Sequence, residues 1–130
     1  MDIAAARPEP IPFYAEMSSV NPIFILPSAM KKNFEGIATG LHGSVTLGAG
    51  QFCTKPGFVI LPEAEETKRF TEKFGELILQ TPNHPLLTEG IKNNFEKLSA
   101  GRETKLTSAK NDLQGYDVNP SVFQTDASKF

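Results

Sequence analysis

Two short, uninterrupted apolar runs divide the first half of the chain, each ending at a proline. They are IFIL at residues 23–26 and FVIL at residues 58–61. Such runs are typical of strands that are buried on both faces, as in parallel sheets. Between them, apolar side chains recur every three or four residues and predict a helix over residues 28–46, with Ser28 as its N-cap. The apolar positions of that helix are Met30, Phe34, Ile37, Leu41 and Val45.

The second half of the chain predicts two more amphipathic helices. The first follows Pro62 and has an acidic first turn, which suits the positive end of a helix dipole. Its buried positions are Phe70, Phe74, Leu77 and Ile78. The second is marked by apolar residues at 87, 91, 95 and 98, with Thr88 as N-cap and Gly101 as the stop. Residues 102–119 are mostly polar and show little periodicity, while SVFQT at 121–125 predicts a short strand.

Both ends of the chain resemble interrupted elements. AAARPEPIP, at residues 4–12, reads as the tail of a helix that three prolines stop, and FYAEM at 13–17 is a candidate extended segment. Alternation of apolar strands with amphipathic helices predicts an α/β fold, a three-layer αβα domain with a mostly parallel sheet. A helix tail at the start and a lone strand at the finish suggest a segment of a longer protein.

Charge and composition narrow the class of partner. Thirteen basic and fifteen acidic residues give a net charge of −2, which offers no electrostatic footprint for nucleic acid or for an anionic membrane surface. No apolar run is long enough to cross a bilayer, and the N-terminus lacks a signal-peptide pattern. A single cysteine permits no internal disulfide and agrees with a reducing compartment. We expect a cytoplasmic protein that binds neither nucleic acid nor membrane.

The single cysteine, Cys53, is the first candidate for chemistry. Taken alone, a lone cysteine is most often a small buried apolar side chain. Gly48, Gly50 and Gly57 surround it in a loop between a predicted helix and a predicted strand, where α/β folds place their sites. The same glycines would equally serve an ordinary turn. The residues alone therefore leave a structural and a reactive cysteine both open.

Other candidate chemistries have weaker support. His42 and His84 read as surface or packing residues, and two scattered histidines with one cysteine do not give zinc-site spacing, so no metal is expected. The glycines of residues 43–50 lack the Lys-Ser or Lys-Thr of a phosphate-binding loop. Nothing near Cys53 matches a thiol-protease signature. Lys55 either attracts an anionic substrate or is simply solvated.

Two stretches carry a resemblance to a known family. EMSSVNPIF, from residue 16, and GSVTLGAGQFCTKPG, from residue 43, resemble the glutamate and cysteine motifs of the aldehyde dehydrogenase superfamily. Met-Ser-Ser-Val after the glutamate, in place of the commoner Leu-Gly-Gly-Lys, is similar to the α-ketoglutarate semialdehyde (2,5-dioxovalerate) dehydrogenase branch. The resemblance runs through essentially the whole chain and is strongest over residues 11–61.

This resemblance implies a set of roles. Cys53 would be the nucleophile that attacks the aldehyde carbon, and its backbone N–H would form part of the oxyanion hole. Glu16 would be the general base for the water that hydrolyses the resulting thioester. Phe52 and Thr54 would bind substrate, and Met17 would lie toward the cofactor, NAD or NADP. The substrate implied is 2,5-dioxopentanoate, oxidised to 2-oxoglutarate, with a fatty aldehyde as the neighbouring alternative.

The resemblance also implies how the chain divides. Residues 1–12 would be the tail of the cofactor-binding domain, and residues 13–130 the first part of the catalytic domain. Because the dinucleotide-binding turn and the second oxyanion donor would lie outside it, we expect the isolated chain to be inactive, with exposed apolar surface and a tendency to aggregate. The whole protein would be a homo-oligomer. A non-catalytic interaction module with an idle thiol is the alternative from another class.

Overall fold

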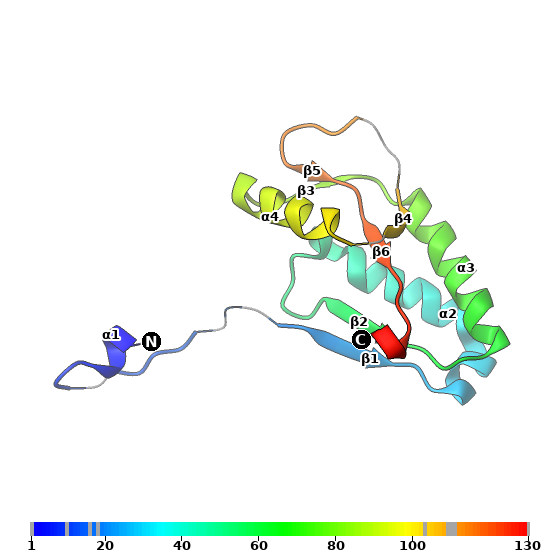
Figure 1. Cartoon of the computed structure of the whole chain (residues 1–130), viewed down its shortest axis with the longest axis horizontal. Coiled ribbons are helices and arrows are strands. Elements are labelled where there is room, and N and C mark those ends of the chain that lie inside the picture. Colours follow the sequence, from blue (N-terminus) through cyan, green and yellow to red (C-terminus); the bar gives the residue numbers. More distant parts are fainter. Residues whose placement is uncertain are drawn as a thin grey trace.

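The computed structural model describes residues 2–9, 11–15, 17, 19–102, 104–108 and 112–129, with residues 104 and 105 described by their backbone only. It is a mixed α/β structure, which confirms the predicted class (Figure 1). The helices are α1 (Asp2–Ala5), α2 (Pro27–Thr46), α3 (Glu65–Gln80) and α4 (Glu89–Ala100), with 3₁₀ turns η1 (Leu47–Gly50) and η2 (Ala127–Lys129). The strands are β1 (Asn21–Phe24), β2 (Pro56–Ile60), β3 (His84–Pro85), β4 (Thr104–Thr107), β5 (Asp117–Val118) and β6 (Ser121–Phe123).

A strand–helix–strand unit positions the cysteine loop. β1 and β2 pair in parallel, with Ile23 opposite Val59 and Phe24 opposite Ile60, and α2 makes the crossover between them. This confirms the two predicted strands and the helix that separates them. The other described strands form two antiparallel pairs, β3 with β5 and β4 with β6. The three-layer arrangement with a mostly parallel sheet stays a prediction.

The start of α2 differs from the prediction. Ser28 is not the N-cap, because the helix begins one residue earlier at Pro27, whose ring fixes φ near the helical value. Asn33 then interrupts the helix with φ −160° and ψ 59°. Its side-chain oxygen accepts the Gly36 N–H at 3.0 Å, so Asn33 acts as the cap of the longer second part of α2. Gly36 lies close against the Asn33 side chain, leaving no space for a Cβ atom.

The core lies between α2, α3 and the β1–β2 pair (Figure 1). Its buried members are Ile25, Met30, Ala38, Leu41 and Phe70. On α3, Phe70 and Ile78 are both only 2% exposed, which confirms the predicted apolar face of that helix. The Phe70 and Phe74 rings stack with centroids 6.0 Å apart, and the Arg69 guanidinium lies 4.4 Å from the Phe34 ring centroid. The Arg69–Phe34 contact joins α3 to α2, whereas the Phe70–Phe74 stack lies within α3.

The prediction that the apolar strands are buried on both faces is wrong for the described part of the chain. Along β1, half-buried and exposed positions alternate, and Phe24 is 66% exposed. Leu26, directly after the strand, is 64% exposed. The described elements therefore cover one face of this strand pair, which also confirms the predicted exposed apolar surface. Aggregation stays a prediction.

The fourth helix has the predicted ends but not the predicted burial. The Thr88 hydroxyl accepts the Ile91 N–H at 3.3 Å and caps the helix, and Gly101 is its C-cap. However, α4 has no buried residue, and Ile91 and Leu98 are exposed. The apolar stripe that predicted this helix does not enter the core described here.

Differences are greatest at the two ends of the chain. The predicted N-terminal helix tail is present as the single turn α1, which lies away from the body of the molecule (Figure 1). The described positions of the extended candidate 13–17 form no strand. The stretch 102–119, which has no periodic signal, contains β4 and β5. The predicted strand at 121–125 is observed as β6. It pairs with β4, and Thr104 lies opposite Phe123.

Two adjacent residues of α3 test this packing. Ile78 is buried and Leu79 is 49% exposed, so the two offer apolar side chains of equal size in different surroundings. We expect Ile78→Ala to lower the free energy of unfolding by about 2–5 kcal/mol, because it removes buried methyl groups and leaves a cavity. Leu79→Ala should cost about 1 kcal/mol or less. Urea unfolding followed by circular dichroism measures both, and equal losses would contradict the described core.

Candidate functional site

The cysteine loop owes its shape to three consecutive residues in the left-handed region. After α2 ends at Thr46, Gly48, Ala49 and Gly50 have φ values of 56°, 58° and 73°. The chain then enters a turn over residues 52–55 that is closed by the Lys55 N–H donating to the Phe52 carbonyl at 3.0 Å. Cys53 is in the middle of this turn, exposed and with a free thiol. The thiol is therefore presented to solvent and not packed in the core.

The two glycines are required by space as well as by φ. A Cβ atom on Gly50 would lie 2.8 Å from the Lys55 side chain and 3.1 Å from the Val45 carbonyl oxygen. A Cβ on Gly48 would collide with the Phe52 ring. Positive φ already disfavours other residues at these positions. The glycine-rich approach is thus needed to bring residues 52–55 back against the end of α2.

The two motifs of the family resemblance meet at this turn. Ser19 Oγ and Asn21 Nδ2 donate to the Cys53 carbonyl oxygen at 2.6 and 2.7 Å. Asn21 Nδ2 also donates to the Lys55 carbonyl oxygen at 3.0 Å. A carbonyl oxygen has two lone pairs, so the two donors saturate that of Cys53 and fix the orientation of its peptide. Residues more than thirty positions apart therefore hold the cysteine's backbone.

The predicted site residues are partly brought together. Phe52 and Thr54 flank Cys53 in the turn and are exposed beside it. Met17 is 78% exposed and makes no core contact. Glu16 lies outside the described residues. Among the hydrogen bonds between described residues, none uses the Cys53 N–H as donor.

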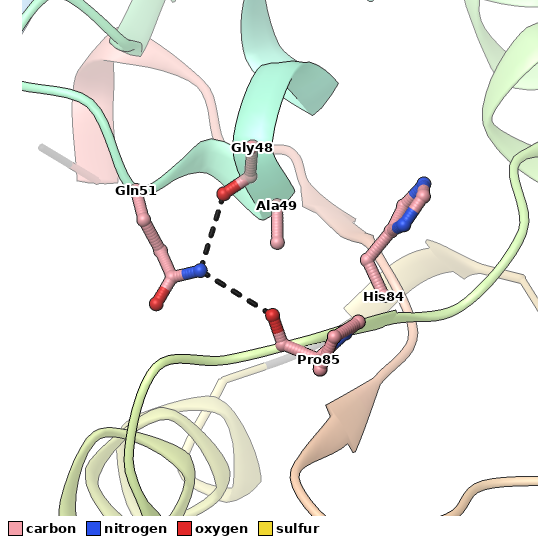
Figure 2. Close-up of a pocket in the computed structure, with 5 residues that line it drawn as sticks. All are labelled: Gly48, Ala49, Gln51, His84 and Pro85. Atoms are coloured by element: carbon pink, nitrogen blue, oxygen red, sulfur yellow. Dashed lines mark hydrogen bonds between the residues drawn. The ribbon is translucent and has the colours of Figure 1, made fainter.

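A shallow pocket of about 300 Å³ lies beside the loop. It is lined by Gly48, Ala49, Gln51, His84 and Pro85 (Figure 2). His84 is exposed there, which agrees with its interpretation as a surface or packing residue, and it lies in β3. Gln51 is the residue whose structural role the sequence analysis missed. Its place two residues before the cysteine, in the Gly-Gln-Phe-Cys run, was the available signal.

His42 has a packing role, as predicted. Its Nε2 lies 2.7 Å from Thr81 Oγ1, and the Thr81 hydroxyl donates to the Leu77 carbonyl at 2.9 Å. Because the single hydroxyl proton is already used, His42 Nε2 is the donor of this pair. Ser108 Oγ, fully buried, donates to the Thr81 carbonyl oxygen at 3.0 Å. The cluster ties α2, the end of α3 and the end of β4 together.

The described residues do not fit a dinucleotide or a metal. A dinucleotide pyrophosphate binds where a glycine-rich turn leads into a helix N-terminus. Here the glycines follow the C-terminus of α2 and lead to a turn and β2, so the helix dipole has the wrong sign for phosphate. Within the described ranges, no three His, Cys, Asp or Glu side chains are grouped to hold a metal ion.

The helices in the described part of the chain include none with the length and apolar character to cross a bilayer.

The class of protein follows from comparison with known sequences. No protein-family model matches the chain. The sequence is nevertheless similar to aldehyde dehydrogenases through nearly its whole length, which confirms the resemblance carried by the two motifs.

The particular relatives agree with the predicted branch. The chain is 51% identical over 140 aligned positions to the α-ketoglutaric semialdehyde dehydrogenase of Acinetobacter baylyi, a match that covers 98% of the chain and 25% of that relative. It is 43% identical over 95 residues to α-ketoglutaric semialdehyde dehydrogenase 2 of Azospirillum brasilense, covering 73% of the chain and 18% of the relative. The chain thus spans a quarter or less of the length of these two relatives.

Substitution of single glycines tests the geometry of the loop. We expect Gly50→Ala to lower the free energy of unfolding by about 1–2 kcal/mol from its left-handed backbone alone. The close contacts with Lys55 and Val45 would add to that loss. Gly43→Ala is the matched control, because a Cβ on Gly43 meets nothing within 4 Å and lies in α2. That control should stabilise the chain by about 0.5–1 kcal/mol. Urea unfolding measures both, and a neutral Gly50→Ala would contradict the loop geometry.

Proposed function

We propose that this chain is the nucleophile-bearing part of an NAD- or NADP-dependent aldehyde dehydrogenase, which oxidises an aldehyde to a carboxylic acid through a thioester on Cys53. The observation that carries the proposal is the set of hydrogen bonds from Ser19 and Asn21 to the carbonyl oxygens of the Cys53 turn. These bonds join the two segments that resemble the glutamate and cysteine motifs of the family. The similarity to proteins named α-ketoglutaric semialdehyde dehydrogenase supports the same assignment.

In the proposed reaction, the Cys53 thiolate attacks the aldehyde carbon and forms a C–S bond. The oxyanion that develops is stabilised by the Cys53 N–H, which no described group occupies. The nicotinamide supplies the hydride acceptor for the oxidation. Glu16 then removes a proton from water as the water oxygen attacks the thioester carbon. The C–S bond breaks, the acid leaves and the Cys53 thiolate is regenerated. Phe52 and Thr54, which flank the thiol, contact the substrate, and Met17 lies toward the cofactor.

The proposed division of the protein follows from the two motifs and from the poor fit of the described residues to a dinucleotide. Residues 1–12 are assigned to the end of a cofactor-binding domain and residues 13–130 to the first part of a catalytic domain. Because the described residues do not fit NAD or NADP, the cofactor is assigned mainly to protein outside this chain. The exposed Phe24 and Leu26 support a three-layer αβα domain in which further protein covers the open face of β1 and β2. The whole enzyme is proposed to be cytoplasmic and homo-oligomeric.

The proposed substrate is a short aldehyde that carries a carboxylate, 2,5-dioxopentanoate, and the product is 2-oxoglutarate. The names of the two relatives favour this substrate over a fatty aldehyde. The side chain of Lys55, at the end of the Cys53 turn, is a candidate to attract the substrate carboxylate.

The reaction is tested by aldehyde-dependent reduction of NAD and NADP. We expect the longer protein that contains this chain to oxidise 2,5-dioxopentanoate faster than a long-chain aldehyde. Cys53→Ala should lower kcat by more than ~10³-fold, because it removes the nucleophile. The isolated 130-residue chain should show no activity, since it does not fit the cofactor. A better rate with the long-chain aldehyde would move the protein to the fatty aldehyde branch. A folded longer protein without any aldehyde oxidation would favour a non-catalytic interaction module.

The role of Glu16 is tested by trapping the intermediate. In Glu16→Gln, the attack by Cys53 still occurs but the water lacks its base, so one equivalent of acyl-enzyme should accumulate. Intact-protein mass spectrometry after mixing with aldehyde and NAD or NADP detects the added acyl mass, which Cys53→Ala should abolish. We expect steady-state turnover to fall by about 10²–10⁴-fold, the usual contribution of a general base. Turnover at the wild-type rate in Glu16→Gln would assign the base to another residue.

A further inference from the structure

The side-chain amide of Gln51 joins the cysteine loop to a segment that lies more than thirty residues later. Its Oε1 accepts the Leu87 N–H at 2.8 Å. Its Nε2 donates to the Gly48 carbonyl at 3.1 Å and to the Pro85 carbonyl at 3.4 Å (Figure 2). Both ends of the carboxamide are therefore used, and both reach backbone groups of residues 84–87.

The segment that Gln51 reaches is itself firmly held. β3 pairs with β5 through His84 opposite Val118 and Pro85 opposite Asp117. Leu86 is buried, and its N–H donates to the Tyr116 carbonyl at 3.0 Å. Thr88, two residues after Leu86, caps α4. The Gln51 contacts therefore tie the loop to a part of the fold with its own strand pairing and helix cap.

The loop, in contrast, has few other supports on this side. Gly48, Ala49 and Gly50 are all in the left-handed region, and two of the three are glycines, which gain the most freedom when unfolded. Gln51 follows directly, with its own N–H on the Gly48 carbonyl at 3.1 Å, and the Cys53 turn begins at the next residue. Asn21, at the start of β1, and Ser19, two residues before it, donate to the Cys53 carbonyl in that turn. Gln51 ties the entrance of the turn to Pro85 in β3 and to Leu87 just after that strand.

We propose that Gln51 is a positioning residue for Cys53: its carboxamide clamps the entrance of the 52–55 turn to residues 84–87 and so fixes where the thiol is presented. The inference rests on the proposed function only in giving Cys53 the role of nucleophile. The clamp itself is a property of the fold, and it is measured without aldehyde or cofactor.

Amide hydrogen exchange on the 130-residue chain tests the clamp. Gln51→Met keeps the length of the side chain and removes all three hydrogen bonds. We expect exchange at Leu87, which loses its acceptor, and at Lys55, whose N–H closes the Cys53 turn, to become about three- to tenfold faster, the factor that one hydrogen bond is worth. The Thr67 amide, bonded to the Ala64 carbonyl at 3.1 Å at the start of α3, should not change. Gln80→Met, at an exposed position at the end of α3, is the control variant and should leave all three rates unchanged.

A conservative variant separates the clamp from a general loss of stability. Gln51→Glu retains an acceptor for the Leu87 N–H and loses the donor to Gly48 and Pro85. It should keep slow exchange at Leu87 and give an intermediate exchange rate at Lys55. Should Gln51→Met fail to fold, this comparison of Gln51→Glu with wild type tests the positioning role. Faster exchange at Leu87 in Gln51→Met, without any change at Lys55 in either variant, would overturn the positioning role. Unchanged exchange at Leu87 in Gln51→Met would overturn the contact itself.

The active enzyme provides a second readout. In the longer protein, Gln51→Met should lower kcat about three- to tenfold with little change in KM, because the thiol is misplaced while substrate contacts remain. An unchanged kcat together with faster exchange at Lys55 would overturn the link to Cys53. If the wild-type longer protein oxidises no aldehyde, the proposed function fails, and the exchange result still stands or falls by itself.

Discussion

Hydrogen bonds from the start of β1 to the carbonyls of the Cys53 turn are the constraint on which the site depends. In the register of the parallel pair, Asn21 lies opposite Pro56. Proline has no N–H, so the backbone ladder between the two strands loses a donor at this point. The Asn21 side-chain amide bonds instead to the carbonyls of Lys55 and Cys53, which precede that proline. A side chain thus continues the pairing past the end of the sheet and into the loop.

The same arrangement explains why the crossover helix must end as it does. α2 returns the chain to the start of β2, and the Cys53 turn must reach Ser19 and Asn21 within a few residues of the helix end. Three successive left-handed residues make this reversal, and Gly48 and Gly50 leave room for Phe52 and Lys55 to fold back over them. Tight placement of the turn therefore requires glycines, which lose much conformational freedom on folding and add no side-chain contacts. Contacts from outside the loop are needed to stabilise it.

Sequence patterns predicted the elements best where burial decides them. The stripes of α2 and α3 follow from apolar periodicity, because Met30, Leu41, Phe70 and Ile78 are buried. The strands β1 and β2 follow from the two uninterrupted apolar runs. β4 and β5 were missed because short antiparallel pairs are fixed by partners elsewhere in the chain, such as the one that sets Leu106 opposite Val122. The Asn33 cap inside α2 was missed for a related reason. Its role depends on a backbone angle that composition does not reveal.

For the site, the sequence named the residues and the structure supplies the links between some of them. The motifs indicated that the stretches containing Ser19 and Cys53 act together, and the hydrogen bond between them gives that pairing a physical basis. Neither periodicity nor motif spacing could show that Gln51 reaches residues 84–87, because this contact depends on where β3 lies after α3. Hydrogen bonds thus hold the turn and its entrance to segments at two strands, β1 and β3, which belong to different sheets. Relative movement of those two strand pairs would therefore shift the backbone that carries the Cys53 thiol.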